Sequence, residues 1–507
     1  MGIDTAKFAL AEAIEREAKV STNLKDLALA SSGLEKLNGL GVENTVETSI
    51  YEIGLVGEMG FGVASCPDEL LKTGYVKMTG HNDKSSKNYG RLMDSNGSEF
   101  FYIPPFHYKM VGNVITIASK QTTGFNPAPF MLWDSNGFYA PAYLMGNVGG
   151  KLVSKQYLDP VSTKSSHNPI GDLQSAPANN YGGFVDACNA MGYKCLSIFE
   201  WHSLALLSLA QSQSGAGSES VAFNDIAPYF PKGCNNNALG DTNDSTLSFL
   251  ESGYSNCALT GSANNIAKTT HNGQTCGVAD VNGDMYKIVT GLTYMAKTTN
   301  GDKTTSDDTI NIPSHSLAVD DIIYFGGSPS VGSTYNTSSY TINSISGDDI
   351  TLDRTLDNDL GDGSGVYSPK YFRILKTTVH PSNITSANIH DETLYDLLDL
   401  TGIVDNNSGR AYFGNGGETV LNFSTVTSSR EYKASLLGIP TADGTSGSGT
   451  TEFGNDRIYR CLKHGLVPIV GLNWDNASNA GVFSVFLDYY SSYSRDAVGG
   501  FASVSLS

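Results

Sequence analysis

Turn-forming residues divide most of this sequence into short segments, which limits what the chain can fold into. The 507 residues include 55 glycines. Two Asp-Ser-Asn-Gly stretches, at 94–97 and 134–137, carry the Asn-Gly pair that favours tight hairpins. Apolar runs such as 100–103, 114–117 and 466–470 lie between such turns and are typical of strands. The sequence therefore predicts many turns and short strands.

Two regions carry a helical period instead. Leucines and other apolar residues recur among Glu and Lys over the first forty residues. This spacing predicts a helical segment over residues 1–50, either an attachment or coiled-coil arm or a helical hairpin packed on its own domain. A second helical period begins at 183 and ends at Gly192. Ser197 and Glu200 then have the spacing of a capping box, which predicts the start of another helix.

The chain is longer than one ordinary domain, so we expect two or three folding units. Residues 298–370 differ from the rest, because β-rich runs at 309–312, 322–325, 340–342 and 350–352 alternate with Asp/Gly/Ser turns. This segment is predicted to be an inserted small all-β domain. It would divide a larger α+β domain into residues 51–297 and 371–507.

Charge and composition exclude several classes of function. Lys and Arg total 32 against 51 Asp and Glu, a net charge of −19, which disfavours binding to nucleic acid or anionic lipid. The sequence has no run of about 18 apolar residues and no apolar leader, so we expect neither membrane insertion nor a signal peptide. Seven scattered cysteines without a C-x-x-C pair make a disulfide framework or zinc ribbon improbable.

The motifs of common enzymes are missing. The chain has no H-E-x-x-H, Walker-type or strand-framed G-x-S-x-G motif. The 280–284 stretch resembles a calcium loop only in part, because its glycine is misplaced and Gly291 stands at the twelfth position. The nine histidines show no metal-ligand spacing. We therefore predict no metal and no cofactor, while a distant pair of glycosidase carboxylates stays open.

Three stretches resemble the C-type-lectin-like fold in the branch shared with formylglycine-generating enzymes. Residues 183–201 resemble its helix and LPTEAEWE segment, 277–287 its GLYDMxGNVWEW turn and strand, and 471–476 its RGGSW strand. The resemblance implies an α+β, C-type-lectin-like fold. The enzymes' cysteine pair after the tryptophan strand has no counterpart here, and Lys287 stands where they carry a glutamate associated with calcium. The resemblance therefore implies binding rather than catalysis.

The C-terminal stretch 474–501 resembles the variable region of diversity-generating retroelement target proteins, among them phage tropism determinants. In that family adenines in template-encoded Asn codons are randomised, so that Lys, Glu, Gln, Met and Trp cannot arise. These five residue types number 59 in the chain, and none lies between 475 and 507. The resemblance implies a ligand-binding region over 472–501. Its candidate variable positions are Asn473, Asp475, Asn476, Ser478, Phe486, Asp488, Tyr489, Tyr490, Ser492, Tyr493, Arg495, Asp496 and Ala497.

The cluster contains three tyrosines, two serines, two asparagines and one arginine, and these are residue types that binding surfaces favour. Phe486 fits either a variable position or the core. Trp474, Gly481, Val482, Phe483 and Leu487 are expected to form a buried framework. The sequence thus predicts a non-enzymatic adhesin, a homotrimer at a phage tail, which binds a host cell-surface protein or glycan and attaches to other virion proteins through its N-terminus. The alternatives are a polysaccharide-degrading tail enzyme and a bacterial surface-displayed lectin.

Overall fold

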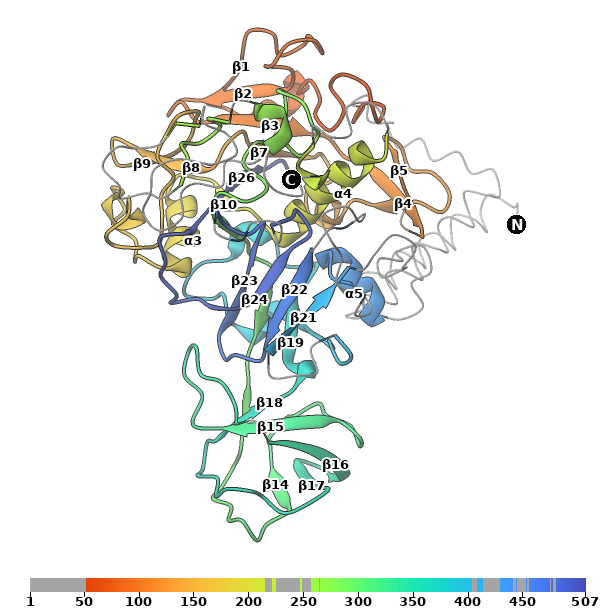
Figure 1. Ribbon diagram of the computed structural model, residues 1–507, viewed down its shortest axis with the longest axis vertical. Helices are drawn as coiled ribbons and strands as arrows, with labels where there is room; N and C mark the ends of the chain where they lie inside the picture. The colour runs from red at the N-terminus through yellow and green to blue at the C-terminus, as the bar shows by residue number, and fades with distance from the viewer. Residues whose placement is uncertain are drawn as a thin grey trace, which may run out of the picture.

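A computed structural model gives the structure of the protein. It describes residues 52–507 except 113, 215–220, 225–246, 249–256, 264, 337, 404–407, 414–428, 441–443, 445–452, 454–455, 475 and 477–479. The predicted helical segment 1–50 lies outside the described residues. Figure 1 shows a larger part, which contains the C-terminus, and a smaller β unit that projects from it.

Strands make up most of the regular structure, so the predicted α+β, C-type-lectin-like class is wrong. Within the described residues the chain forms three α-helices, α3 (Tyr181–Ala190), α4 (Ile198–Ser212) and α5 (Ser429–Leu437), against 26 strands in several mainly antiparallel sheets. The reason is that glycines interrupt the sequence at short intervals. Few stretches are therefore long enough for a helix, whereas three to five residues suffice for a strand.

The first sheet combines strands from the first part of the chain with β26, the last strand. Its order is β1 (Tyr75–Lys77), β2 (Arg91–Asp94), β3 (Glu99–Ile103), β7 (Phe138–Pro141), β26 (Ala502–Ser505) and β10 (Lys194–Cys195). The Asn-Gly turn at 94–97 joins β2 to β3 in a hairpin, as predicted. The turn at 134–137 forms no hairpin and instead precedes β7, which pairs with β3.

A nine-stranded sheet forms the centre of the larger part. Its order is β20 (Tyr395–Leu398), β19 (Phe372–Leu375), β12 (Leu292–Tyr294), β23 (Leu466–Val470), β24 (Val485–Tyr490), β22 (Arg457–Cys461) and β21 (Ser408–Tyr412). β11 (Tyr286–Ile288) pairs with β23 and, in parallel, with β25 (Val498–Gly500). β24 is hydrogen-bonded on both edges, and this central place explains its apolar first half.

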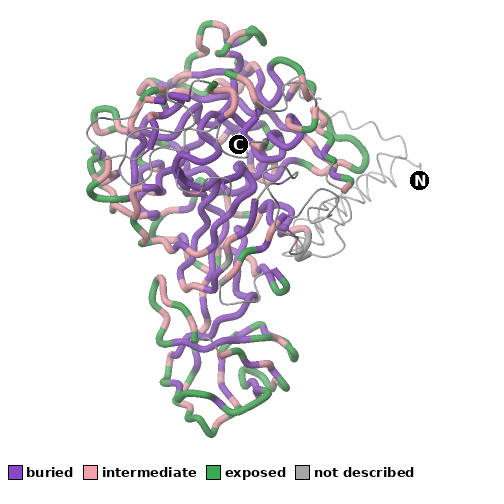
Figure 2. The backbone as a smooth tube through the Cα atoms, viewed as in Figure 1, coloured by how far each residue is buried: buried purple, intermediate pink, exposed green. Residues whose placement is uncertain are grey.

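The strands of the smaller β unit pair only with one another among the described residues. Their order is β13 (Lys297–Thr298), β18 (Gly365–Tyr367), β15 (Ile322–Gly326), β16 (Ser339–Ser346), β17 (Asp349–Leu352) and β14 (Thr309–Asn311). They occupy the segment for which the sequence predicts an inserted β domain. β14, β16 and β17 lie at the end away from the larger part. Figure 2 shows more exposed chain in this unit than in the interior of the larger part.

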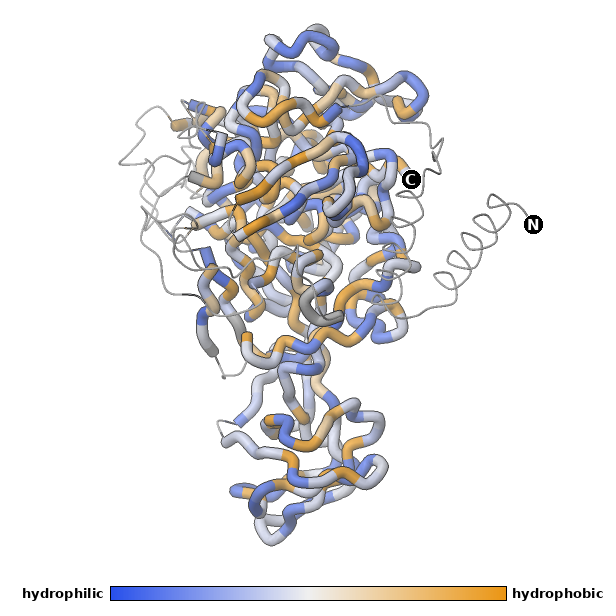
Figure 3. The backbone as a smooth tube through the Cα atoms, turned by 90° about the vertical axis from the view of Figure 1, so that its right-hand side faces the viewer, coloured by the Kyte–Doolittle hydropathy of each residue, from blue (hydrophilic) through white to orange (hydrophobic). Residues whose placement is uncertain are grey.

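Two small sheets complete the larger part. β4 (His107–Val111) pairs with β5 (Val114–Ala118) and β6 (Asn126–Pro127), and β8 (Met145–Val148) pairs with β9 (Lys151–Ser154). Figure 3 shows hydrophobic and hydrophilic stretches alternating along the chain in both parts, as strands with one covered face require.

The two predicted helices between 183 and 213 are present. α3 ends at Ala190, and Gly192 follows with a φ of +74°. Ser197 caps α4, and its side chain and that of Glu200 form the predicted capping box. Nearly every residue of α4 is buried rather than one stripe. α4 therefore lies within the core, and polar side chains such as Glu200 and His202 are buried with its apolar ones. Trp201 Nε1 fixes α4 there by donating to the Val482 carbonyl at 2.8 Å.

Candidate functional site

The candidate binding surface is the turn that follows β24. Main-chain hydrogen bonds hold this turn, residues 491–497, against the start of α3: the Tyr181 amide donates to the Tyr493 carbonyl at 3.2 Å and the Gly182 amide to the Ser491 carbonyl at 3.0 Å. The Ser491 amide donates to the Gly465 carbonyl at 3.2 Å. Because these contacts use backbone atoms, they do not depend on which side chains the turn carries.

Thr163 anchors the other end of the turn. Its hydroxyl accepts from the Arg495 amide at 2.9 Å and lies 3.1 Å from the Arg495 carbonyl, while its own amide donates to the Val498 carbonyl at 2.9 Å. The Ser494 hydroxyl donates to the Thr163 carbonyl. The turn is thus fixed at both ends by elements that lie far away in the sequence.

The structure divides the predicted site residues into three groups. Ser492 is exposed and six residues are half-buried: Asn476, Asp488, Tyr490, Tyr493, Arg495 and Asp496. Four are buried: Asn473, Phe486, Tyr489 and Ala497. Asp475 and Ser478 lie outside the described residues. The expected framework is buried at all five positions: Trp474, Gly481, Val482, Phe483 and Leu487.

The cluster from Asp488 to Ala497 is expected to be exposed, and this expectation is wrong at Tyr489 and Ala497, which are buried. Phe486 stacks on Tyr459 at 5.2 Å between ring centroids. Tyr489 lies 5.6 Å from the Tyr286 ring, and Ala497 accepts the Tyr286 amide through its carbonyl at 2.9 Å. These neighbours come from β22 and β11, and they cover one side of β24 and the end of the turn. For Phe486 the core interpretation is the correct one.

Three tyrosines, two of them half-buried and one buried, form the centre of the surface. The Tyr493 ring meets Tyr489 at 4.4 Å and Tyr490 at 5.5 Å, in both cases edge to face. The ammonium of Lys463 lies 5.7 Å from the centroid of the Tyr490 ring, within range of a cation–π interaction. Arg495 Nη1 donates to the Tyr489 hydroxyl at 3.2 Å. The aromatic rings are thus held in fixed positions before any ligand arrives.

Charged groups flank these rings. Asp496 lies 3.8 Å from His167 Nε2 and 3.9 Å from Arg495 Nε. Burial raises the pKa of Asp488, against the attraction of Lys463 and Arg495. The Lys463 ammonium donates to the Asp488 carbonyl. The surface therefore combines aromatic rings with charges of both signs, which suits recognition of a folded surface.

Comparison with known proteins adds no family to this description. The chain matches no protein-family model, and no curated protein matches it.

Several residues of the surface are not visible from sequence reasoning. Thr163 and Tyr286 lie far from the 472–501 stretch, and Lys463 lies just before it. Tyr286 reaches the stretch through the pairing of β11 with β23 and β25, and Lys463 through the pairing of β23 with β24. Thr163 reaches it through hydrogen bonds with Arg495 and Val498. No local motif marks them. Only knowledge of the strand order could have identified them.

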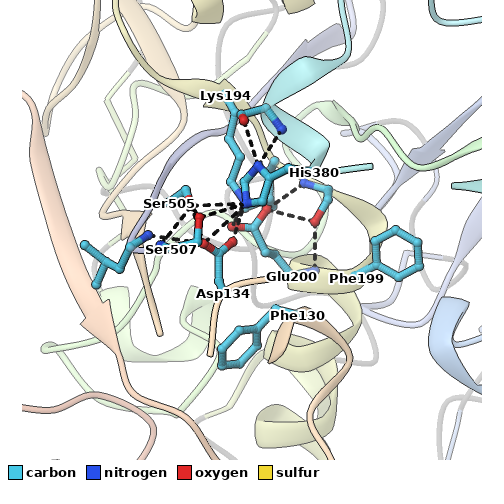
Figure 4. A network of polar contacts seen from close by, with 12 residues as sticks. Phe130, Asp134, Lys194, Phe199, Glu200, His380, Ser505 and Ser507 are labelled. Carbon is cyan, nitrogen blue, oxygen red and sulfur yellow. Dashed lines mark hydrogen bonds and ion pairs between the residues drawn. The ribbon is translucent and has the colours of Figure 1, made fainter. Parts of the chain in front are cut away.

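A second group of polar residues is buried beneath β26. Lys194 Nζ lies 2.8 Å from Asp134 Oδ2 and 3.1 Å from Glu200 Oε1, and all three side chains are 1–2% exposed (Figure 4). Burial disfavours the charge on Asp134, but contacts with His380, Lys194 and Ser505 outweigh burial and hold the pKa of Asp134 below its usual range. The two carboxylates likewise raise the pKa of Lys194 against the effect of burial.

Asp, His and Ser side chains meet here, but not as a catalytic triad. Asp134 Oδ1, Ser505 Oγ and Ser507 Oγ all approach the same His380 nitrogen, Nε2, at 3.6, 3.2 and 3.3 Å. A triad places the acid and the nucleophile on opposite ring nitrogens. The Ser382 amide donates to the other nitrogen, Nδ1, at 3.1 Å. This group ties the C-terminal strand to the core.

A buried lysine lies beside the stretch that resembles a calcium loop. Lys287 lies buried with Asp280 and Asp284, and its ammonium donates to the Gly283 carbonyl. Burial raises the pKa of Asp280 to about 6 and lowers that of Lys287 to about 8. In the described part of the chain, no group of three or more His, Cys, Asp or Glu side chains is arranged to hold a metal ion. No helix of that part is both long and apolar enough to cross a membrane.

Proposed function

We propose that this protein is a non-enzymatic receptor-binding protein that recognises a protein or glycan on the surface of a cell. The binding residues would be Asp488, Tyr490, Ser492, Tyr493, Arg495 and Asp496. One observation carries the proposal: backbone contacts fix the 491–497 turn while its side chains reach the surface. Such an arrangement separates stability from recognition, so the side chains can change without unfolding the scaffold.

The resemblance to retroelement targets leads to the rest of the proposal. The protein would be the host-recognition adhesin of a phage tail, diversified at codons within 472–501. The N-terminal segment would attach it to other virion proteins, and the assembly would be a homotrimer. Several copies of one weak site bind a cell far more tightly than a single copy does, so a randomised surface can be useful before it is optimised.

Adsorption to intact bacterial cells tests binding. The labelled full chain would be incubated with a panel of bacterial strains and compared with Ser492→Trp, which adds bulk at the exposed centre of the turn. We expect the natural chain to adsorb to at least one strain and the variant to adsorb at least tenfold less. If no strain is bound, or if the variant binds as well, the proposed site is wrong. Release of oligosaccharide from the cells would instead support a degrading enzyme.

The neighbouring DNA tests diversification. We expect a reverse transcriptase gene and a near-copy of the codons for 474–501 that differs mainly at adenines. A complete genome that lacks both would overturn the retroelement part of the proposal and leave the adsorption result unaffected.

A further inference from the structure

The smaller β unit contributes a loop to the same surface as the tyrosines. This loop, residues 327–336, connects β15 to β16 and lies against the turn 463–465 that precedes β23. The Gly332 amide donates to the His464 carbonyl at 2.8 Å, and the His464 amide donates to the Ser333 carbonyl at 2.9 Å. Two opposed main-chain hydrogen bonds thus fix the loop beside the start of β23.

The contact extends to Tyr490 itself. Gly332 has a φ of +89°, and a Cβ at this position would come within 3.0 Å of Tyr490 Cε1. The backbone of the loop therefore packs directly against the tyrosine ring. A Cβ on Gly465 would likewise come within 3.2 Å of both methyl groups of Val331. Only glycine at 332 and 465 permits this approach without displacing a neighbour.

The loop is ordered by its own contacts. The Ser333 hydroxyl lies 2.9 Å from the Tyr367 hydroxyl of β18, and it accepts from the Ser330 amide at 3.1 Å. The Gly365 amide donates to the Gly327 carbonyl at 3.1 Å. Five other residues of the loop are exposed: Ser328, Ser330, Val331, Thr334 and Asn336, with Val331 at 44%.

We propose that the 327–336 loop forms one side of the ligand-binding surface and contacts the same ligand as Tyr490 and Ser492. This inference rests on the proposed function and extends it to the smaller β unit. Figure 1 places that unit next to the central sheet at the end where β15 and β18 lie. The unit would then orient a constant loop beside a variable turn, so that recognition combines both.

The ligand we infer is a folded protein. An exposed valine and tyrosine rings lie next to small polar side chains and to charges of both signs. This mixture, with an aromatic centre and a polar rim, is the usual composition of protein–protein interfaces. The contributing segments belong to two different sheets, which meet at Gly332 and Tyr490, so the surface continues from one sheet to the other.

Cell adsorption by the full chain tests the inference. The variants are Ser330→Trp and Val331→Asp in the loop, Ser492→Trp in the turn, and the control Ser344→Trp, an exposed serine of β16 away from the loop. Equal melting temperatures would show that all variants fold. We expect both loop variants and Ser492→Trp to reduce adsorption at least tenfold, and Ser344→Trp to stay within twofold of the natural chain. Protease treatment of the cells should abolish adsorption and periodate should not.

Each of the other outcomes contradicts one identified part of the proposal. If Ser492→Trp weakens adsorption but both loop variants bind normally, the loop inference is wrong and the proposed function stands. If the natural chain adsorbs to no strain, or Ser492→Trp has no effect, the proposed function fails and the loop inference fails with it. Loss of adsorption after periodate but not after protease would identify a glycan and overturn the inferred protein ligand.

Discussion

Replacing Lys194 with methionine tests how the C-terminal strand is held. The Lys194 ammonium is the cation between Asp134 and Glu200, and the side chains of all three are almost completely buried. Methionine fills a similar space without charge, so Lys194→Met leaves the carboxylates of Asp134 and Glu200 buried without their cation. Removing one partner of a buried ion pair costs about 3–5 kcal/mol. We expect the free energy of unfolding at pH 7 to fall by about this amount.

The pH dependence of this loss of stability shows whether it comes from the uncompensated carboxylates or from poorer packing. In the natural chain the pKa of Asp134 is lower when folded than when unfolded, so its stabilisation is complete above the unfolded value of about 3.9 and is lost as the pH falls through the folded value. Without Lys194, only the contacts with His380 and Ser505 oppose the effect of burial, and we expect the folded pKa of Asp134 to rise above the unfolded one. As the pH falls, protonation of Asp134 then removes the uncompensated charge from the folded variant. The difference in the free energy of unfolding between the natural chain and the variant should therefore become smaller between pH 7 and about pH 4.5.

Urea unfolding of both proteins at pH 7 and pH 4.5 measures this effect. Lys77→Met is the matched control, because Lys77 pairs with the fully exposed Asp68, and its unfolding midpoint should not change. If Lys194→Met lowered the free energy of unfolding by less than about 1 kcal/mol, or by the same amount at the two pH values, the buried ion pairs would not stabilise the fold as argued.

Two further predictions concern the central sheet. Tyr489→Ala should lower the free energy of unfolding by about 3–5 kcal/mol, as for other buried aromatic residues. Ser492→Ala should change it by no more than about 0.5 kcal/mol. Equal effects of the two variants in urea unfolding would contradict the division into buried framework and surface. Burial raises the pKa of Asp456 to about 7, above its unfolded value, so stability should decline as the pH rises from about 4 to 7. Asp456→Asn should weaken that decline, measured as the melting temperature against pH. An unchanged pH profile in the variant would show that Asp456 does not cause the decline.

The features that depend only on neighbouring residues could be predicted from the sequence. The capping box at Ser197 and Glu200, the hairpin at 94–97 and the strand at 466–470 each follow from neighbouring residues, and each is present. The fold class was not predictable in this way. It depends on how many strands pair and with which partners. β26 shows the difficulty, since it pairs with β7 and β10, which lie far earlier in the sequence.

The same limit explains the candidate site. Alternation in a strand would place Phe486, Asp488 and Tyr490 on one face of β24, but Val485, Phe486 and Leu487 are all buried, and only from Asp488 does burial alternate. Tyr459 and Tyr286 cover the first half of the strand, and neither is near it in sequence. A diversified protein can vary only those side chains that are not buried in the core. The codons for Tyr490, Ser492, Tyr493 and Arg495 should therefore differ from a template repeat, whereas those for Phe486 and Tyr489 should match it.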